Sequence, residues 1–135
     1  SAVLLWSRVR IAGMPLDAFC QQKGIAPPDQ EAVTANTRQA AYRIIERKGA
    51  TYYAIGLGIR RICEAILKDQ KSVLTISGLL SGQYGYRDLA FSLPTIVGKR
   101  GRDVSLELPL ATAELTALRQ SAAVLKAAQE RLGYR

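Results

Sequence analysis

Apolar residues recur along the first half of the chain with the spacing of an α-helix. The predicted helices cover residues 1–12, 16–24, 27–49 and 51–69. The third of them starts at Pro27-Pro28-Asp29, because proline fits the first turn of a helix and an acidic residue there complements the helix dipole. Glycine follows or ends each of the first three patterns, which is typical of helix termini.

The second half of the chain changes to the two-residue period of β-strands. The predicted strands cover residues 72–80, 89–94 and 104–110. Short turns at 81–85 and 98–102 join them, so we expect an antiparallel meander, with the second strand at an edge because it contains Pro94. A last amphipathic helix begins at Thr112. Helices, then strands, then a helix indicate an α+β fold, with long helices packed on a small three-stranded antiparallel sheet.

The stretch from Lys48 to Ile59 joins two predicted helices. Thr51 follows Gly49-Ala50 and is suited to begin the second helix, since a threonine hydroxyl can accept a bond from a free backbone N–H. Gly56 and Gly58 lower the helix propensity, and close approach of another backbone or a ligand would compensate for them. Two interpretations stay open from the residues alone: a plain joint between helices, or a threonine that faces a ligand at a helix start.

The composition excludes several classes of catalytic and metal-binding site, but it does not identify a function. With 135 residues and 48% hydrophobic residues the chain is long enough for one globular domain, and no apolar run is long enough to cross a membrane. Histidine is absent, which removes histidine general bases, Ser-His-Asp systems and nearly all ordinary zinc sites, so we expect no metal and the range of possible catalytic sites is heavily restricted. The two cysteines, Cys20 and Cys63, are far apart and fit a reducing compartment; Cys63 lies in an apolar pattern and is predicted to be buried.

The charge balance is basic, with 19 Lys and Arg against 11 Asp and Glu. Such a balance favours anionic partners and weak nonspecific binding of nucleic acid. The positive residues are scattered, however, and the one tight group, residues 99–102, is predicted to be a solvated hairpin turn. Gly56-x-Gly58 follows no strand and lacks the third glycine of a dinucleotide-binding loop, so it is no coenzyme fingerprint.

Taken together, the stretches of this chain resemble the C-terminal half of bacterial L-lactate dehydrogenases, in the lactate/malate dehydrogenase family. The resemblance covers essentially all residues and rests on five stretches. They are residues 5–16 (LWSRVRIAGMPL), 40–56 (AAYRIIERKGATYYAIG), 72–77 (SVLTIS), 91–98 (FSLPTIVG) and 121–126 (SAAVLK). The resemblance implies a C-terminal substrate-binding domain over residues 1–135, and implies a Rossmann coenzyme domain that this chain lacks.

The resemblance also implies roles for three residues. Thr51 matches the family threonine that lines the pyruvate pocket, and Ile55 matches the isoleucine that packs against the nicotinamide of NAD. Tyr42 matches a tyrosine described as phosphorylatable; the alternative is a packed ring with a solvated hydroxyl. The parent protein is then expected to be a cytoplasmic homotetramer that converts pyruvate and NADH to L-lactate.

In the family, the catalytic histidine, its aspartate and the two substrate arginines lie upstream of the matched region. We therefore expect these residues alone to be inactive, and expect the chain to be a piece of a longer protein. Two alternatives stay open. A malate dehydrogenase has the same fold, although Thr51 favours the lactate enzyme, and a basic binding module without catalysis would use its charge for a partner.

Overall fold

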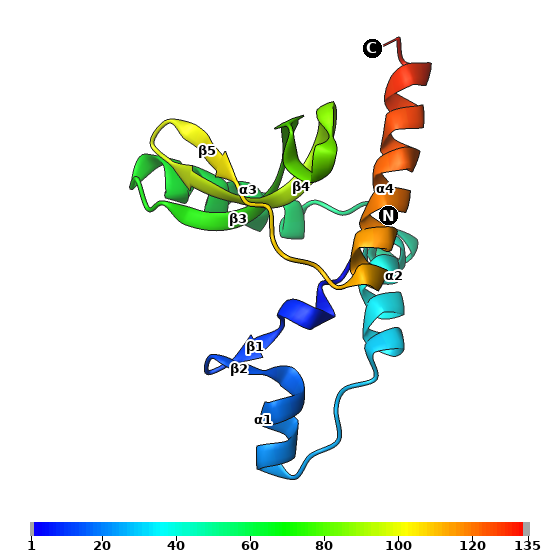
Figure 1. Ribbon diagram of the computed structural model, residues 1–135. Coiled ribbons are helices and arrows are strands. Elements are labelled where there is room, and N and C mark those ends of the chain that lie inside the picture. The colour runs from blue at the N-terminus through cyan, green and yellow to red at the C-terminus, as the bar shows by residue number, and fades with distance from the viewer. Residues whose placement is uncertain (1, 134–135) are drawn as a thin grey trace. The chain divides into compact units, whose positions relative to one another are not determined.

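The computed structural model describes residues 2–133 and divides into two compact units. Unit 1 comprises Ser1–Ala50 with Leu110–Ser121, and unit 2 comprises Thr51–Pro109 with Ala122–Arg135. Helices and an antiparallel sheet are both present, so the α+β class is confirmed (Figure 1). Among the residues described, no helix combines the length and the apolar character needed to span a membrane.

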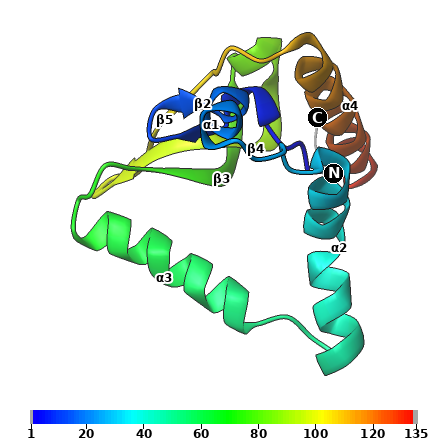
Figure 2. The same ribbon diagram turned by 90° about the horizontal axis from the view of Figure 1, so that it is seen from below.

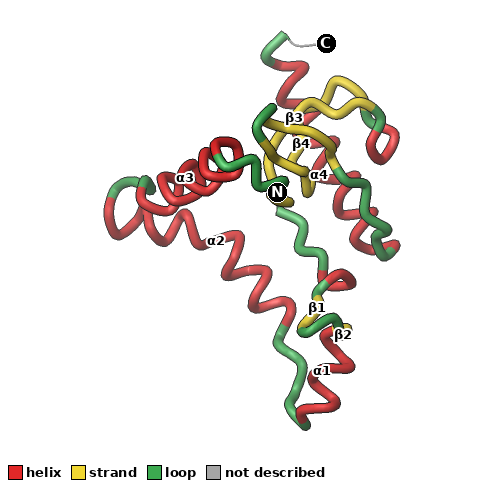
Figure 3. The backbone as a smooth tube through the Cα atoms, turned by 90° about the vertical axis from the view of Figure 1, so that its left-hand side faces the viewer, coloured by secondary structure: helices red, strands yellow, loops and turns green. Residues whose placement is uncertain are grey.

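Unit 1 begins with a 3-10 turn and a small hairpin (Figure 3). Its elements are η1 (Trp6–Arg8), β1 (Arg10–Ile11), β2 (Met14–Pro15), α1 (Leu16–Lys23), α2 (Gln30–Lys48) and the first half of α4 (Thr112–Arg131). The helix predicted over 1–12 is therefore wrong. Ala12 and Gly13 both have positive φ (50° and 81°), which forms a two-residue hairpin turn between β1 and β2 instead of continuing a helix.

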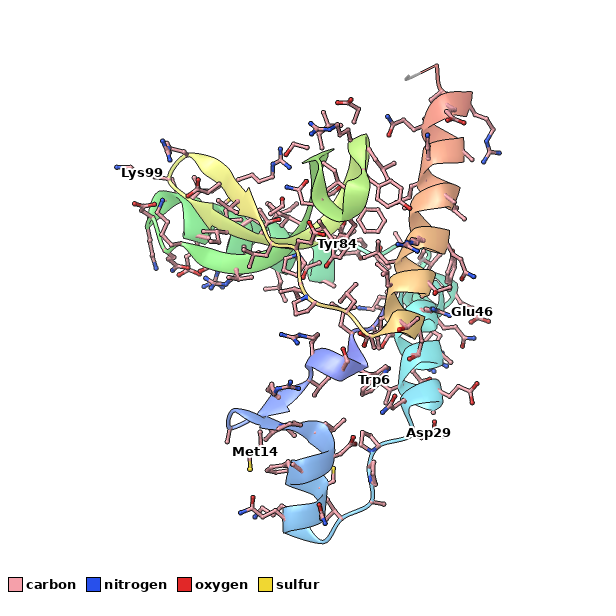
Figure 4. The ribbon with its side chains drawn as sticks, in the orientation of Figure 1. Trp6, Met14, Asp29, Glu46, Tyr84 and Lys99 are labelled. Carbon is pink, nitrogen blue, oxygen red and sulfur yellow. The ribbon has the colours of Figure 1, made fainter. Side chains whose placement is uncertain are left out.

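The two helices that follow end where the sequence predicts, but α2 begins at Gln30, so Pro27 and Pro28 precede the helix instead of forming its first turn. Asp29 is the N-cap of α2, and its carboxylate accepts a bond from the Ala32 N–H at 2.9 Å. Gly24 and Gly49 end α1 and α2 in the left-handed conformation, with φ of 64° and 75°, which only glycine adopts without strain. Trp6 lies beside α2 and donates its indole N–H to Thr34 (3.3 Å; Figure 4).

Unit 2 contains one helix and the main sheet. Its elements are α3 (Tyr53–Leu67), β3 (Ser72–Ser81), η2 (Gln83–Gly85), β4 (Arg87–Gly98), β5 (Gly101–Ser105) and the second half of α4. The strand order β3-β4-β5 is antiparallel throughout, so the predicted meander is confirmed. A turn joins β4 and β5 as predicted, but it covers only residues 99–100 of the predicted 98–102, and Lys99 points outward from its tip (Figure 4).

β4 provides most of the buried core of unit 2. Leu89, Leu93 and Val97 are buried on one face of this strand, and Ile76 of β3 lies opposite Leu93. α3 leads through a short loop into β3 (Figure 2). α3 also contacts β4, and Ala65 is the buried residue of that helix. The alternation that predicted a half-buried strand therefore has the expected physical basis, a pleated surface with one covered face.

The edge position predicted for the second strand is wrong, since β4 lies in the centre of the sheet. Pro94 is tolerated there because its carbonyl accepts the Leu106 N–H (2.7 Å), so its nitrogen faces the β5 side, where strand pairing has already ended at Ser105. The third strand is displaced from its prediction, since β5 (Gly101–Ser105) begins three residues before the predicted 104 and ends five residues before the predicted 110. Residues 106–110 leave the sheet, and Val104 is half exposed.

Side chains tie the loops of unit 2 to the sheet. The Tyr84 hydroxyl donates to the Leu108 carbonyl and accepts from the Leu108 N–H, both at 2.8 Å, which replaces strand pairing for this segment (Figure 4). Burial raises the pKa of the Tyr84 phenol, because the charged form is poorly solvated there; the Leu108 bond opposes this and Glu107 adds to it. The Asp69 carboxylate accepts the Lys99 N–H at 2.8 Å, and this bond is the main reason that its pKa is lowered.

Candidate functional site

The candidate site is the start of unit 2, residues 51–59, which follow the end of α2 in the chain. Gly49 ends α2, residues 50–51 have no regular structure, and Tyr52 is the N-cap of α3. The prediction that Thr51 begins the helix is therefore wrong by one residue, and no side chain caps α3. Thr51 is partly exposed and precedes the N-cap residue, so its hydroxyl does not cap α3 as the sequence predicted.

The first two turns of α3 present an apolar surface to solvent. Ile55 is 57% exposed, and its neighbours Leu57 and Ile59 are similarly exposed. Nothing lies within 4 Å of the positions where a Cβ of Gly56 or Gly58 would be, so the close approach that we expected is not made by any residue from 2 to 133. A helix that is apolar all round is normally covered. This part of α3 is therefore suited to contact a flat ligand or another protein surface.

The other residues singled out from the sequence lie elsewhere. Tyr42 lies in α2 of unit 1 and is 74% exposed, so its ring is not packed as the alternative interpretation required. Cys63 lies on α3 and is exposed, which contradicts its predicted burial; Cys20 is the buried cysteine. Across residues 2–133, His, Cys, Asp and Glu side chains form no group arranged to hold a metal ion.

Unit 1 contains a pocket that the sequence did not predict. It has a volume of about 400 Å³ and is lined by side chains that include Trp6, Arg10, Leu16 and Glu114. A helix over residues 1–12 would leave no room for this pocket, whereas the turn at Ala12-Gly13 before Met14-Pro15 is a signal that the sequence does contain. Of its two acidic lining residues, Asp17 and Glu114, the carboxylate of Glu114 is held by hydrogen bonds within unit 1.

Glu114 joins the start of α4 to η1 within unit 1. Its carboxylate accepts the Ser7 N–H (2.8 Å), the Ser7 hydroxyl (2.5 Å) and the Ala111 N–H (3.0 Å). Partial burial raises the pKa of this carboxyl. The bonds from Ser7 and Ala111 and the charge of Arg8 together lower the pKa by more than burial raises it, so the net pKa lies below the ordinary 4.5.

We expect the Glu114 contact to make stability depend on acid pH. A lowered folded pKa means that the stabilisation is complete above the unfolded pKa of about 4.5 and is lost as pH falls through the folded value. Glu114→Gln should therefore lower Tm at neutral pH, and the difference from the unmodified chain should shrink towards pH 3. Thermal unfolding followed by circular dichroism from pH 3 to 7 measures this, with Glu46→Gln on the exposed end of α2 as the control. A constant difference at every pH would rule out the carboxylate as the cause.

Comparison with known proteins decides the family. The profile of the lactate/malate dehydrogenase, alpha/beta C-terminal domain, matches residues 1–132. The chain belongs to the lactate/malate dehydrogenase family. The resemblance drawn from the sequence is thereby confirmed.

Individual relatives agree with this family assignment. The L-lactate dehydrogenase of Thermoanaerobacter sp. (strain X514) is 47% identical over 134 residues, which are 98% of this chain and 43% of that protein. The L-lactate dehydrogenase of Thermus aquaticus is 45% identical over 136 residues, covering 99% of this chain and 44% of that protein. The crystal structure of the minor L-lactate dehydrogenase from Enterococcus mundtii, in its ligand-bound form, superposes with a TM-score of 0.84 at 32% identity over 96% of this chain and 41% of that one.

The family domain thus spans less than half of the relatives' length. Its fold matches the corresponding part of a solved L-lactate dehydrogenase. The roles of Thr51, Ile55 and Tyr42 stay predictions, since neither the fold nor the identities test single residues.

Proposed function

We propose that these residues form the substrate-binding side of an NAD-dependent L-lactate dehydrogenase, which reduces pyruvate to L-lactate. The observation that carries the proposal is the 45–47% identity to L-lactate dehydrogenases over nearly the whole chain. The coenzyme domain of the enzyme, a Rossmann domain, is proposed to lie outside these residues.

Thr51 is proposed to line the pyruvate pocket. The proposal is supported by its place at a chain bend, where a partly exposed hydroxyl is not used as a helix cap. A threonine hydroxyl can donate to a carboxylate or ketone oxygen of the substrate, and its methyl group limits the room beside it. Thr51 would then hold pyruvate in the orientation that the reaction requires, without taking part in proton transfer.

Ile55 is proposed to pack against the nicotinamide ring. An exposed isoleucine one helical turn after the chain bend, next to the open surface of Gly56, fits one face of a flat ring. When bound, the reduced nicotinamide supplies the hydride for the substrate ketone. The part of this chain is to exclude water from that face and to fix the ring's position relative to Thr51.

The isolated chain is expected to be inactive. Reduction of a ketone needs a proton donor as well as a hydride, and this chain contains no histidine to act as the family's acid. Purified residues 1–135, mixed with NADH and pyruvate, should show no change in absorbance at the NADH wavelength beyond the buffer rate. Steady, pyruvate-dependent oxidation of NADH would overturn the proposal that the chemical groups lie outside the chain.

The two alternative functions, a malate dehydrogenase and a basic binding module, are supported to different degrees. A malate dehydrogenase is compatible with the family domain, whose description names both enzymes. The lactate enzyme is favoured, because the relatives that match nearly the whole chain at 45–47% identity are L-lactate dehydrogenases. The binding-module alternative gains no support, since the basic turn at Lys99 and Arg100 is a solvated hairpin tip, and Asp103 lies 3.8 Å from the Arg100 guanidinium. We therefore propose no nucleic-acid or membrane partner.

We propose that this chain associates with further copies of itself, and that the complete enzyme is a tetramer. Large apolar side chains are exposed on α2 and, separately, on α3, and exposed apolar surface favours association. They are Val33, Ile44 and Ile45 on α2, and Leu57 and Ile59 on α3. At micromolar concentration the purified chain should sediment faster than a monomer of 14.7 kDa, and Leu57→Lys should shift it towards the monomer. A single monomer boundary for the unmodified chain would contradict this proposal.

Two further features follow from the same proposal. Tyr42 is proposed as a phosphorylatable tyrosine, and its exposure on α2 leaves the hydroxyl accessible. We also propose a cytoplasmic location, which is supported by two cysteines that form no disulfide.

A further inference from the structure

We draw no further inference here: the strongest candidate, the exposed apolar face of α3 around Leu57 and Ile59, is a helix face for which nothing in residues 2–133 shows what covers it.

Discussion

Replacing Thr51 by valine is expected to lower kcat/KM for pyruvate by about 10- to 100-fold, because the substrate carboxylate or ketone loses one hydrogen bond. A bond to a charged partner contributes about 1.5–3 kcal/mol, and each 1.36 kcal/mol corresponds to about a tenfold change in rate. The assay uses a chimera in which residues 1–135 replace the matched region of the Thermus aquaticus L-lactate dehydrogenase, which is 45% identical over 136 residues. Initial rates at several pyruvate concentrations give kcat and KM separately.

Two matched variants separate a pocket role from a general loss of stability. Thr37→Val removes a threonine hydroxyl from α2 that donates to the Val33 carbonyl (2.8 Å), and it should leave the kinetics unchanged. Thr51→Ser keeps the hydroxyl and should retain most of the activity. If Thr51→Val and Thr37→Val have equal kcat/KM values, Thr51 does not line the pocket.

Leu93→Ala is expected to lower the free energy of unfolding of unit 2 by about 2–5 kcal/mol, the usual cost of a cavity in a packed core. Leu93 is 4% exposed, lies in the central strand, and faces Ile76 on β3. The sheet has only three strands, so a cavity at its centre affects both of the strand interfaces. Urea unfolding followed by far-UV circular dichroism measures the change in midpoint and slope.

The control for this core variant is Leu67→Ala. Leu67 is 85% exposed at the end of α3, so the same truncation should change the free energy of unfolding by less than about 0.5 kcal/mol. An equally small effect at Leu93 would mean that the core of unit 2 is not where the buried face of β4 indicates.

The sheet was largely predictable, because its information is local. Leu89, Phe91 and Leu93 alternate with small or polar residues, and this two-residue period survives in the folded strand with all three buried. The position of the strand in the sheet is not local information. Pro94 indicates an edge by the general rule, but its missing N–H falls where β5 has ended, and this depends on Leu106, which lies twelve residues later in the chain.

The errors near the N-terminus and on α3 have a different cause. The apolar run from Ala2 to Trp6 lacks a helix cap and is followed by a turn, so its tertiary neighbours, not its propensity, set its conformation. Arg38 of α2 donates to the Ala2 carbonyl (3.1 Å) in place of any helical partner. Cys63 lies in an apolar pattern that periodicity assigns to a core, yet no residue from 2 to 133 buries it.

In the candidate site, too, some features could be predicted from local sequence signals and others could not. Gly49 and the start of α3 could be located from helix-end signals, to within one residue. The role of Thr51 could not, because a hydroxyl at a helix start has the same local pattern whether it caps the helix or binds a substrate. Only the resemblance to a family gives Thr51 and Ile55 their proposed partners.

Pyruvate-dependent oxidation of NADH by the Thermus aquaticus chimera tests the central proposal most directly. The chimera combines a coenzyme-binding part from a known L-lactate dehydrogenase with residues 1–135 as the substrate-binding part. We predict steady turnover of pyruvate, which Thr51→Val reduces. A folded chimera that binds NADH but does not oxidise it when pyruvate is added would contradict the proposal that these residues form the substrate side of an L-lactate dehydrogenase.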